Sequence, residues 1–214
     1  MLERNILIID DNTRVGKIYI PAYLKTINTL KASSEKWAKY TFNLTHCPSM
    51  KSALDYLSDS SNYVDVLVVD YDFNGEATFS NGTAFVNHIR EKINRFCQIV
   101  FYSMNARANI EVDEWVSLVN SDVYQFVDKC SDTSIMGKVI FDAATRRNPV
   151  VESLERFWCK YEVLLSTYNF SYDHRQITFE EIINHIRMDD EIGREFVQKL
   201  LQKAIILSTA VRGE

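Results

Sequence analysis

The sequence lacks several features that mark large classes of protein. Its four cysteines are widely separated and form no CxxC pair or Cys/His ligand set, so we expect unpaired thiols and a cytoplasmic location. No apolar run approaches the roughly 18 residues of a membrane-spanning helix, and the first residues have no signal-peptide pattern. The net charge of −5 gives no basic excess, which argues against binding to DNA or to an anionic membrane.

Short apolar, β-branched runs are the most prominent positive feature. Hydrophobic residues make up 46% of the 214 residues, which is enough for a packed core. The apolar runs alternate with helical patterns up to about residue 146, and this alternation predicts an α/β fold with a doubly wound, five-stranded parallel sheet. Pro21 lies inside the first helical pattern, where we expect it to kink or divide the helix. The predicted strands cover residues 5–9, 40–45, 64–70, 98–102 and 123–127.

The strongest candidate for a domain boundary is Asn148-Pro149, because the residue before a proline resists helical geometry. We therefore expect a first domain over residues 1–148 and a second over residues 149–214. The second stretch has three amphipathic patterns, which predict an all-helical extension. A capping-box pattern at Thr178 marks the start of the second of these helices.

Polar side chains follow four of the predicted strands. Asp10 and Asp11 follow the first strand, and Asp70 ends the third. Ser103 follows the fourth strand, and Lys129 comes just after the fifth. The carboxyl ends of parallel strands meet at one edge of the sheet, where open α/β sheets bind ligands. Mg²⁺ prefers oxygen ligands, so the three aspartates are candidate metal ligands, and the cation would relieve their mutual repulsion.

These groups fit the chemistry of an aspartyl phosphate. Asp70 would be the nucleophile and would form a mixed anhydride with an incoming phosphoryl group. Ser103 would hold a phosphoryl oxygen by a hydrogen bond, and Lys129 would hold one by charge. Each residue also has an ordinary explanation: Asp10-Asp11 as a turn or helix cap, Ser103 as a strand-end hydroxyl, and Lys129 as a solvated lysine. The order of all four along the chain favours a functional site.

Residues 3–147 resemble the receiver domain of response regulators in two-component signalling. The resemblance implies a flavodoxin-like fold, Mg²⁺ as cofactor, and a phosphoryl group received from a histidine kinase or a phosphotransfer protein of a phosphorelay. It also implies a phosphoacceptor with at most slow autophosphatase activity rather than an enzyme. The matching segments are Ile8-Ile9-Asp10-Asp11-Asn12, Val68-Val69-Asp70, Gly82, Phe101-Tyr102-Ser103 and Phe126-Val127-Asp128-Lys129.

The same resemblance implies roles for individual residues. Asp70 would be the phosphoacceptor, and the acidic pair after the first strand would bind Mg²⁺. Asp72 would offer its backbone carbonyl to the metal. Ser103 would be the switch hydroxyl, and Phe126 would be the aromatic side chain whose rotamer follows phosphorylation.

Four features depart from the pattern of that family. The residue after the switch hydroxyl is usually very small, but here it is Met104, which we expect to slow phosphoryl access or hydrolysis. Cys130 replaces the usual proline after the lysine, which argues against a cis peptide bond. The loop over residues 71–81 is longer than usual, and the first helix and the loop after it are also extended. Asn105, two residues past the switch position, could orient or block the hydrolytic water, as that position does in the family. We therefore expect the phosphorylation kinetics to be unusual.

A phosphatase is the competing interpretation. Asp70-Tyr71-Asp72 after an apolar strand also resembles the first motif of haloacid-dehalogenase-type phosphatases, in which the second aspartate is the acid/base. In those enzymes the acidic metal pair normally follows the nucleophile, whereas Asp10-Asp11 precedes it here. The order of the motifs therefore favours a receiver.

Two kinds of output partner are open for the second domain. Residues 149–214 carry 11 acidic and 8 basic side chains, and no predicted helix has the basic stripe of a DNA reader. His174 and His185 lack the sequence context of phosphotransfer modules, so we expect them to be structural. An aromatic stripe from Phe157 to Tyr168 favours a protein-binding face, used by a downstream protein or for homodimerisation, with DNA binding as the alternative.

Overall fold

The chain divides into two compact units, residues 1–146 and 147–214, and each has buried apolar residues of its own. No helix in the described part of the chain is long and apolar enough to cross a membrane. The computed structural model describes residues 2–38, 40–59, 62–73, 78–94, 97–104, 110–129, 132–146, 149–188 and 190–210.

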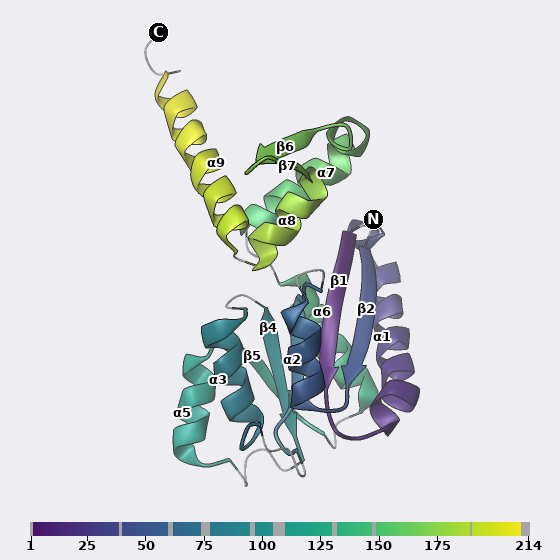
Figure 1. Ribbon diagram of the computed structural model, residues 1–214. Coiled ribbons are helices and arrows are strands. Elements are labelled where there is room, and N and C mark those ends of the chain that lie inside the picture. Colours follow the sequence, from purple (N-terminus) through teal and green to yellow (C-terminus); the bar gives the residue numbers. More distant parts are fainter. Residues whose placement is uncertain are drawn as a thin grey trace. The chain divides into compact units, whose positions relative to one another are not determined.

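Five parallel strands form the sheet of the first unit, in the order β2-β1-β3-β4-β5 (Figure 1). The predicted doubly wound, five-stranded parallel sheet is therefore confirmed. The strand order reverses between β1 and β3, and in open α/β sheets the ligand crevice lies at such a reversal. The strands are β1 (Leu2–Ile9), β2 (Tyr40–Cys47), β3 (Val66–Asp70), β4 (Gln98–Ser103) and β5 (Val123–Asp128).

Helices cover both faces of this sheet, with α1 and α6 on one face and α2, α3 and α5 on the other (Figure 1). Pro21 divides the first helical segment as expected: a π-helical turn, η1, precedes it, and α1 starts one residue before the proline. The bounds are η1 (Val15–Tyr19), α1 (Ile20–Ala32), the 3₁₀ turn η2 (Glu35–Trp37), α2 (Met50–Ser58), α3 (Gly82–Lys92), α5 (Val112–Asn120) and α6 (Thr133–Thr145).

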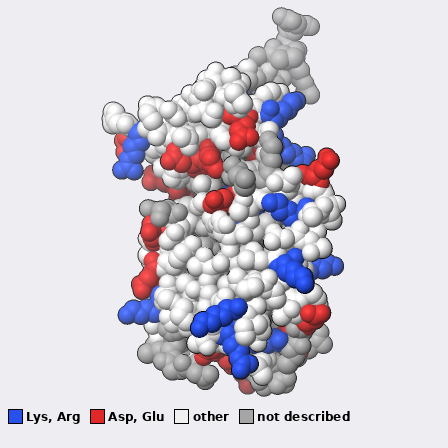
Figure 2. All heavy atoms as spheres, turned by 90° about the vertical axis from the view of Figure 1, so that its right-hand side faces the viewer, with Lys and Arg blue, Asp and Glu red and all other residues white. Residues whose placement is uncertain are grey.

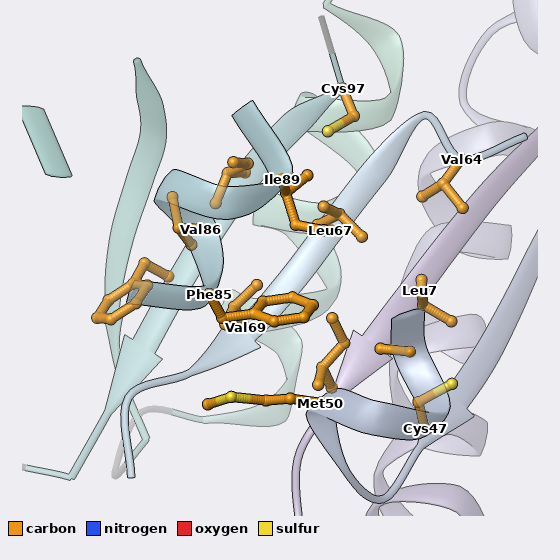
Figure 3. Close-up of a cluster of buried hydrophobic side chains, with 14 of the residues drawn as sticks. Leu7, Cys47, Met50, Val64, Leu67, Val69, Phe85, Val86, Ile89 and Cys97 are labelled. Carbon is orange, nitrogen blue, oxygen red and sulfur yellow. The ribbon is translucent and has the colours of Figure 1, made fainter. Parts of the chain in front are cut away.

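The core under α2 and α3 is built from alternate residues of the central strands. Figure 3 shows Leu7 of β1 and Val69 of β3 on the same side of the sheet as Met50 of α2 and Phe85 of α3. All four side chains are completely buried. Successive strand residues point to opposite faces, so a run that is apolar at every position provides a core on both sides.

The opposite face depends on a close approach of α1 and α6. A Cβ added at Gly137 of α6 would lie 2.8 Å from the Cβ of Thr26 and 3.1 Å from the carbonyl oxygen of Tyr23, both in α1. Only a residue without a side chain fits there without movement of one helix.

The second unit consists of helices and a two-stranded antiparallel hairpin, so the predicted all-helical extension is wrong at one place. The hairpin turns at Asp173 and His174, whose φ angles are 43° and 63°. Two successive residues with positive φ are typical of a tight hairpin turn. Such a turn usually contains a glycine, which would have made it predictable, but here the two positions are aspartate and histidine. The elements are α7 (Pro149–Leu165), β6 (Asn169–Tyr172), β7 (Arg175–Thr178), α8 (Phe179–Met188) and α9 (Glu191–Ala210).

The core of this second unit forms between α7 and α8. The Trp158 ring stacks on Phe179 with centroids 5.8 Å apart, and Arg187 forms an ion pair with the buried Glu155. The predicted capping box is present, because Thr178 and Glu181 bond to each other's backbone N–H groups. Much of the predicted aromatic stripe remains exposed, namely Phe157, Tyr161 and Leu164 on α7 and Tyr168 just after it.

Replacement of Gly137 by alanine should destabilise the first unit. We expect Gly137→Ala to lower the free energy of unfolding by about 1–3 kcal/mol, because the added methyl group overpacks the contact between α1 and α6. Gly16→Ala is a matched control, since its Cβ would first meet a ring nitrogen of His46 at 3.3 Å, a looser approach than either contact at Gly137 and one that involves no backbone atom. Urea unfolding followed by circular dichroism measures both changes. Equal stability of the Gly137 variant and the unaltered protein would contradict the close helix contact.

Candidate functional site

The register of the parallel strands brings the predicted polar residues to one edge of the sheet. Asp10 lies one residue beyond the end of β1, and Lys129 lies one residue beyond the end of β5. The last cross-strand partners at this edge are Ile9 and Val69, Asp70 and Tyr102, and Ser103 and Asp128. The site therefore lies where the strand order reverses.

Three carboxylates converge at this edge. Asp10, Asp11 and Asp70 each offer an oxygen atom, and these atoms lie within 4.8 Å of one another. Asp10 and Asp70 are buried, whereas Asp11 is half-buried. Carboxylate oxygens at this spacing are the hard donors that Mg²⁺ prefers, and negative charges so close together raise one another's pKa unless a cation joins them. These residues therefore fit a magnesium site.

Lys129 lies against two of these carboxylates. Its ammonium nitrogen forms an ion pair with Oδ2 of Asp70 and lies 3.3 Å from Oδ2 of Asp10. The same ammonium stands 5.0 Å from the ring centroid of Tyr102, at cation–π distance. Lys129 thus lies beside a group of three acids that could hold a divalent cation.

The pKa values of Asp70 and Lys129 are both raised, but burial and charge act in opposite directions at each residue. Burial raises the pKa of Asp70 to about 6, although the hydrogen bond and charge of Lys129 oppose this rise. Burial alone would lower the pKa of Lys129, but its bonds to Asp70 and Asp10 and their charges outweigh burial and raise that pKa. Asp70 is therefore ionised at neutral pH but takes up a proton in mildly acidic solution.

The other residues predicted for the site lie around this cluster. The Ser103 hydroxyl is buried and donates to the carbonyl of Met104, at 3.2 Å. Asp72 has an exposed side chain, and its backbone N–H donates to Oδ1 of Asp70 at 3.3 Å. The Phe126 ring packs on Trp115 of α5, with centroids 4.4 Å apart.

The features that depart from the receiver pattern are only partly within the described structure. Met104 is 57% exposed and lines a pocket beside Asp10 and Lys129. Asn105, Cys130 and residues 74–77 of the long loop lie outside the described residues. The expected effects of these positions on kinetics stay predictions.

Tyr102 is a site residue that the sequence reasoning missed. Its buried hydroxyl donates to Oδ2 of Asp10, and burial followed by the Asp10 charge raises the pKa of this phenol well above its usual value. Asn12 donates its backbone N–H to the other carboxylate oxygen of Asp10, at 2.8 Å. Both oxygens of Asp10 are thus oriented by protein donors. A tyrosine in an otherwise apolar buried strand was the available signal, because a buried phenol normally has a polar partner.

A pocket of about 260 Å³ opens beside Asp10 and Lys129. Tyr19 and Tyr23 line one side of it, and Met104 lies on another. This pocket gives solvent and small molecules access to the carboxylate cluster.

Contacts at both ends hold the loop that follows Asp70, which runs from Tyr71 to Asn81. A Cβ added at Gly82 would lie 2.2 Å from the carbonyl oxygen of Asp70, so only glycine fits there. Glu114 of α5 accepts hydrogen bonds from the Tyr71 hydroxyl at 2.8 Å and from the Asn81 amide at 2.5 Å. Burial, followed by the bond to Glu114, raises the pKa of Tyr71 to about 12. This Glu114 clamp ties the residue after Asp70 to α5.

No protein-family model and no curated protein matches this sequence. Similar solved structures are mostly receiver domains of response regulators. One is the signal receiver domain of a protein described as a Luxo repressor from Vibrio parahaemolyticus, with 15% identity and a TM-score of 0.50 over 73% of this chain and 97% of that one.

Two further similar structures are response regulator receiver domains of microbial origin. The one from Methanospirillum hungatei has 11% identity and a TM-score of 0.48 over 67% of this chain and 94% of that one. The one from Clostridium thermocellum has 15% identity and a TM-score of 0.47 over 67% of this chain and 95% of that one. At such identities the likeness to the Vibrio domain establishes a shared fold and leaves function to the site itself. The receiver-type fold predicted from the sequence is confirmed.

The Glu114 clamp should contribute measurably to stability. Glu114→Ala leaves the Tyr71 hydroxyl and the Asn81 amide without their acceptor, and we expect a loss of about 1–3 kcal/mol in the free energy of unfolding. Glu111→Ala is the matched control, because Glu111 is exposed and its side chain makes no capping bond to α5. Chemical unfolding of both variants makes the comparison. A smaller loss in the Glu114 variant than in the Glu111 variant would rule out the clamp.

Binding of Mg²⁺ should depend on pH around the raised pKa of Asp70. Below a pH of about 6 this carboxylate is protonated and loses its charge, so affinity should fall as the pH drops through that value. Isothermal titration calorimetry between about pH 5 and about pH 7.5, which spans that change of charge, measures the affinity. The control Asp70→Asn should bind weakly at every pH, with no step near 6. An affinity that does not change over this range in the unaltered protein would show that Asp70 titrates elsewhere.

Proposed function

We propose that the first unit is the receiver of a two-component response regulator and that Asp70 is its phosphoacceptor. One observation carries the proposal: the buried Asp70 contacts Lys129 beside two further acids, at the strand-order reversal of a receiver-type sheet. The donor would be a histidine kinase or a phosphotransfer protein. The product would be a phosphoprotein with at most slow autophosphatase activity, and a cytoplasmic location remains a prediction.

The proposed reaction is a single phosphoryl transfer. A carboxylate oxygen of Asp70 attacks the phosphorus of a donor phosphohistidine and forms a P–O bond. The P–N bond breaks, its electron pair stays on the imidazole nitrogen, and that nitrogen takes up a proton. Lys129 offsets the negative charge brought by the phosphoryl group, and the Ser103 hydroxyl donates to one of its oxygens.

Mg²⁺ would stabilise negative charge on the phosphoryl oxygens when bound. Asp10, Asp11 and Asp70 are the side chains that would hold it, and the backbone carbonyl of Asp72 is the further proposed ligand. The exposed Asp72 side chain is consistent with a backbone role for this residue. Tyr102 would keep Asp10 oriented toward the cluster through its hydrogen bond.

Ser103 and Phe126 are proposed as the switch pair that reports phosphorylation. The Phe126 ring is packed on Trp115, so a change in its rotamer has to move that side chain and with it α5. Three valines on the outer surface of α5 are exposed, namely Val112, Val116 and Val119, and Asp113 and Asn120 are exposed beside them. Exposed apolar residues suit a protein-interaction surface that phosphorylation can alter.

The second unit is proposed to bind a protein, or a second copy of the chain, rather than DNA. On the face drawn in Figure 2, the described Lys and Arg side chains are scattered among acidic ones and form no continuous basic patch. The hairpin segment 169–178 has one basic residue, Arg175, and one acidic residue, Asp173. Neither feature resembles the basic surface that DNA binding requires.

Phosphoacceptance is tested by intact-mass measurement after incubation with Mg²⁺ and acetyl phosphate. The unaltered chain should gain one phosphoryl group, and Asp70→Asn should gain none, because an amide is a poor nucleophile. Asp72→Asn is the matched control and should still be phosphorylated, since the proposed role of Asp72 uses only its backbone.

Two results would contradict this proposal. An adduct that persists in Asp70→Asn would place the phosphoryl group on another residue. Repeated hydrolysis of p-nitrophenyl phosphate, abolished by Asp72→Asn, would instead indicate a phosphatase in which Asp72 is the acid/base.

A further inference from the structure

The C-terminal half of α9 is an apolar helix with no cover from its own unit in the described structure. Every residue from 198 to 208 is exposed, and the last turns of the helix lie beyond α8 and the hairpin (Figure 1). A helix with this many exposed apolar side chains is normally stabilised by packing against a partner. The large apolar residues are Leu200 (39% exposed), Leu201 (53%), Ile205 (62%), Ile206 (64%) and Leu207 (66%).

Two of these exposed residues, Leu200 and Leu207, continue a stripe that is already used for helix packing. At the start of α9 the stripe packs against α8, where a Cβ added at Gly193 would lie 2.3 Å from the carbonyl oxygen of His185. The residues of this stripe are spaced alternately by four and three positions, which is the spacing found where two helices pack along each other. Beyond α8 the same stripe faces solvent. Its members are Gly193, Val197, Leu200, Ala204 and Leu207.

A groove lies beside this exposed half-helix. It has a volume of about 370 Å³ and runs between the hairpin and α9, with Phe170 and Tyr172 on one side and Phe196 and Leu200 on the other. The α9 residues along it extend from Ile192 to Lys203, which is about 17 Å at 1.5 Å per residue. The exposed segment 198–208 is about 15 Å long by the same measure. Groove and exposed segment therefore match in length.

The charges indicate what occupies this surface. Residues 149–199 carry 10 acidic and 6 basic side chains, whereas residues 200–210 carry a single charge, that of Lys203. The exposed segment is thus complementary in charge to the unit from which it extends. Glu195 and Lys203 stand eight residues apart on one helix. In an antiparallel pair crossing near Lys199, each Lys203 comes level with the Glu195 of the other helix.

We propose that α9 pairs in antiparallel orientation with α9 of a second copy of this chain, and that the exposed segment of each copy lies along the groove of the other. Such a two-fold arrangement uses the same surface on both copies, so it closes as a dimer. It buries exposed apolar side chains of both helices, Leu200 among them, and pairs Glu195 with Lys203 twice. Binding to an anionic membrane is less favoured, because the segment over residues 200–210 has only one basic side chain, Lys203. The pairing does not depend on Asp70, so it stands or falls separately from the proposed phosphorylation.

Sedimentation velocity of the full chain over a concentration series, without a phosphoryl donor, tests the pairing. The unaltered protein should sediment as a dimer, and the double variant Leu200→Gln/Leu207→Gln should shift dissociation to at least tenfold higher concentration. Val163→Gln is the matched control, because Val163 is an apolar residue of α7 that is 87% exposed. This control and Asp70→Asn should both dimerise as the unaltered protein does.

A charge reversal tests the antiparallel orientation. Glu195→Lys and Lys203→Glu should each weaken the dimer, and the double reversal should restore it, because these residues are too far apart on one helix to touch. Glu195 also bonds to Lys199 and Tyr172 within its own chain, so the restoration, rather than either single loss, is the decisive result. A monomer at every concentration, a double reversal that fails to restore dimerisation, or co-sedimentation with phosphatidylglycerol vesicles in place of self-association would overturn the proposal.

Discussion

The ammonium group of Lys129 is the contact on which the candidate site depends. It lies against two buried carboxylates, those of Asp10 and Asp70, at the edge where the strand order reverses. Without it these charges would repel each other, and the strand ends would have to separate or a carboxylate would have to take up a proton. Lys129 therefore makes the buried carboxylates compatible with a folded sheet, and the three acids together could hold a divalent ion.

Local sequence predicted the parts of the structure that depend on local chemistry. Residues 6–9 of β1 and 66–69 of β3 are apolar at every position, which suits a strand covered on both faces. Pro21 divides the first helical segment, and Thr178 caps α8, as predicted. Both effects act within one helical turn, so local sequence is enough to predict them. The convergence of the acidic residues also followed, since parallel strands place their carboxyl ends together whatever the loops between them.

Other features depend on contacts between distant parts of the chain, and no local pattern encodes them. The Tyr102 hydroxyl and its acceptor Asp10 are 92 residues apart, and Tyr71 and Glu114 are 43 apart. The hairpin was missed for a different reason. Its positive φ angles fall on Asp173 and His174, and at a tight turn these residues are less recognisable than asparagine and glycine.

Hydrogen bonds close the loop after Asp70 at its base. The N–H of Gly82 donates to the carbonyl of Tyr71 at 3.0 Å, and Glu114 holds Tyr71 and Asn81 from the other side. Closing a flexible loop costs only about 0.6 kcal/mol more for each doubling of its length, so added residues beyond this base have little effect on the sheet edge. The segment between Tyr71 and Gly82 is therefore a suitable insertion point for a reporter peptide, which would lie next to the carboxylate cluster without displacing Asp70.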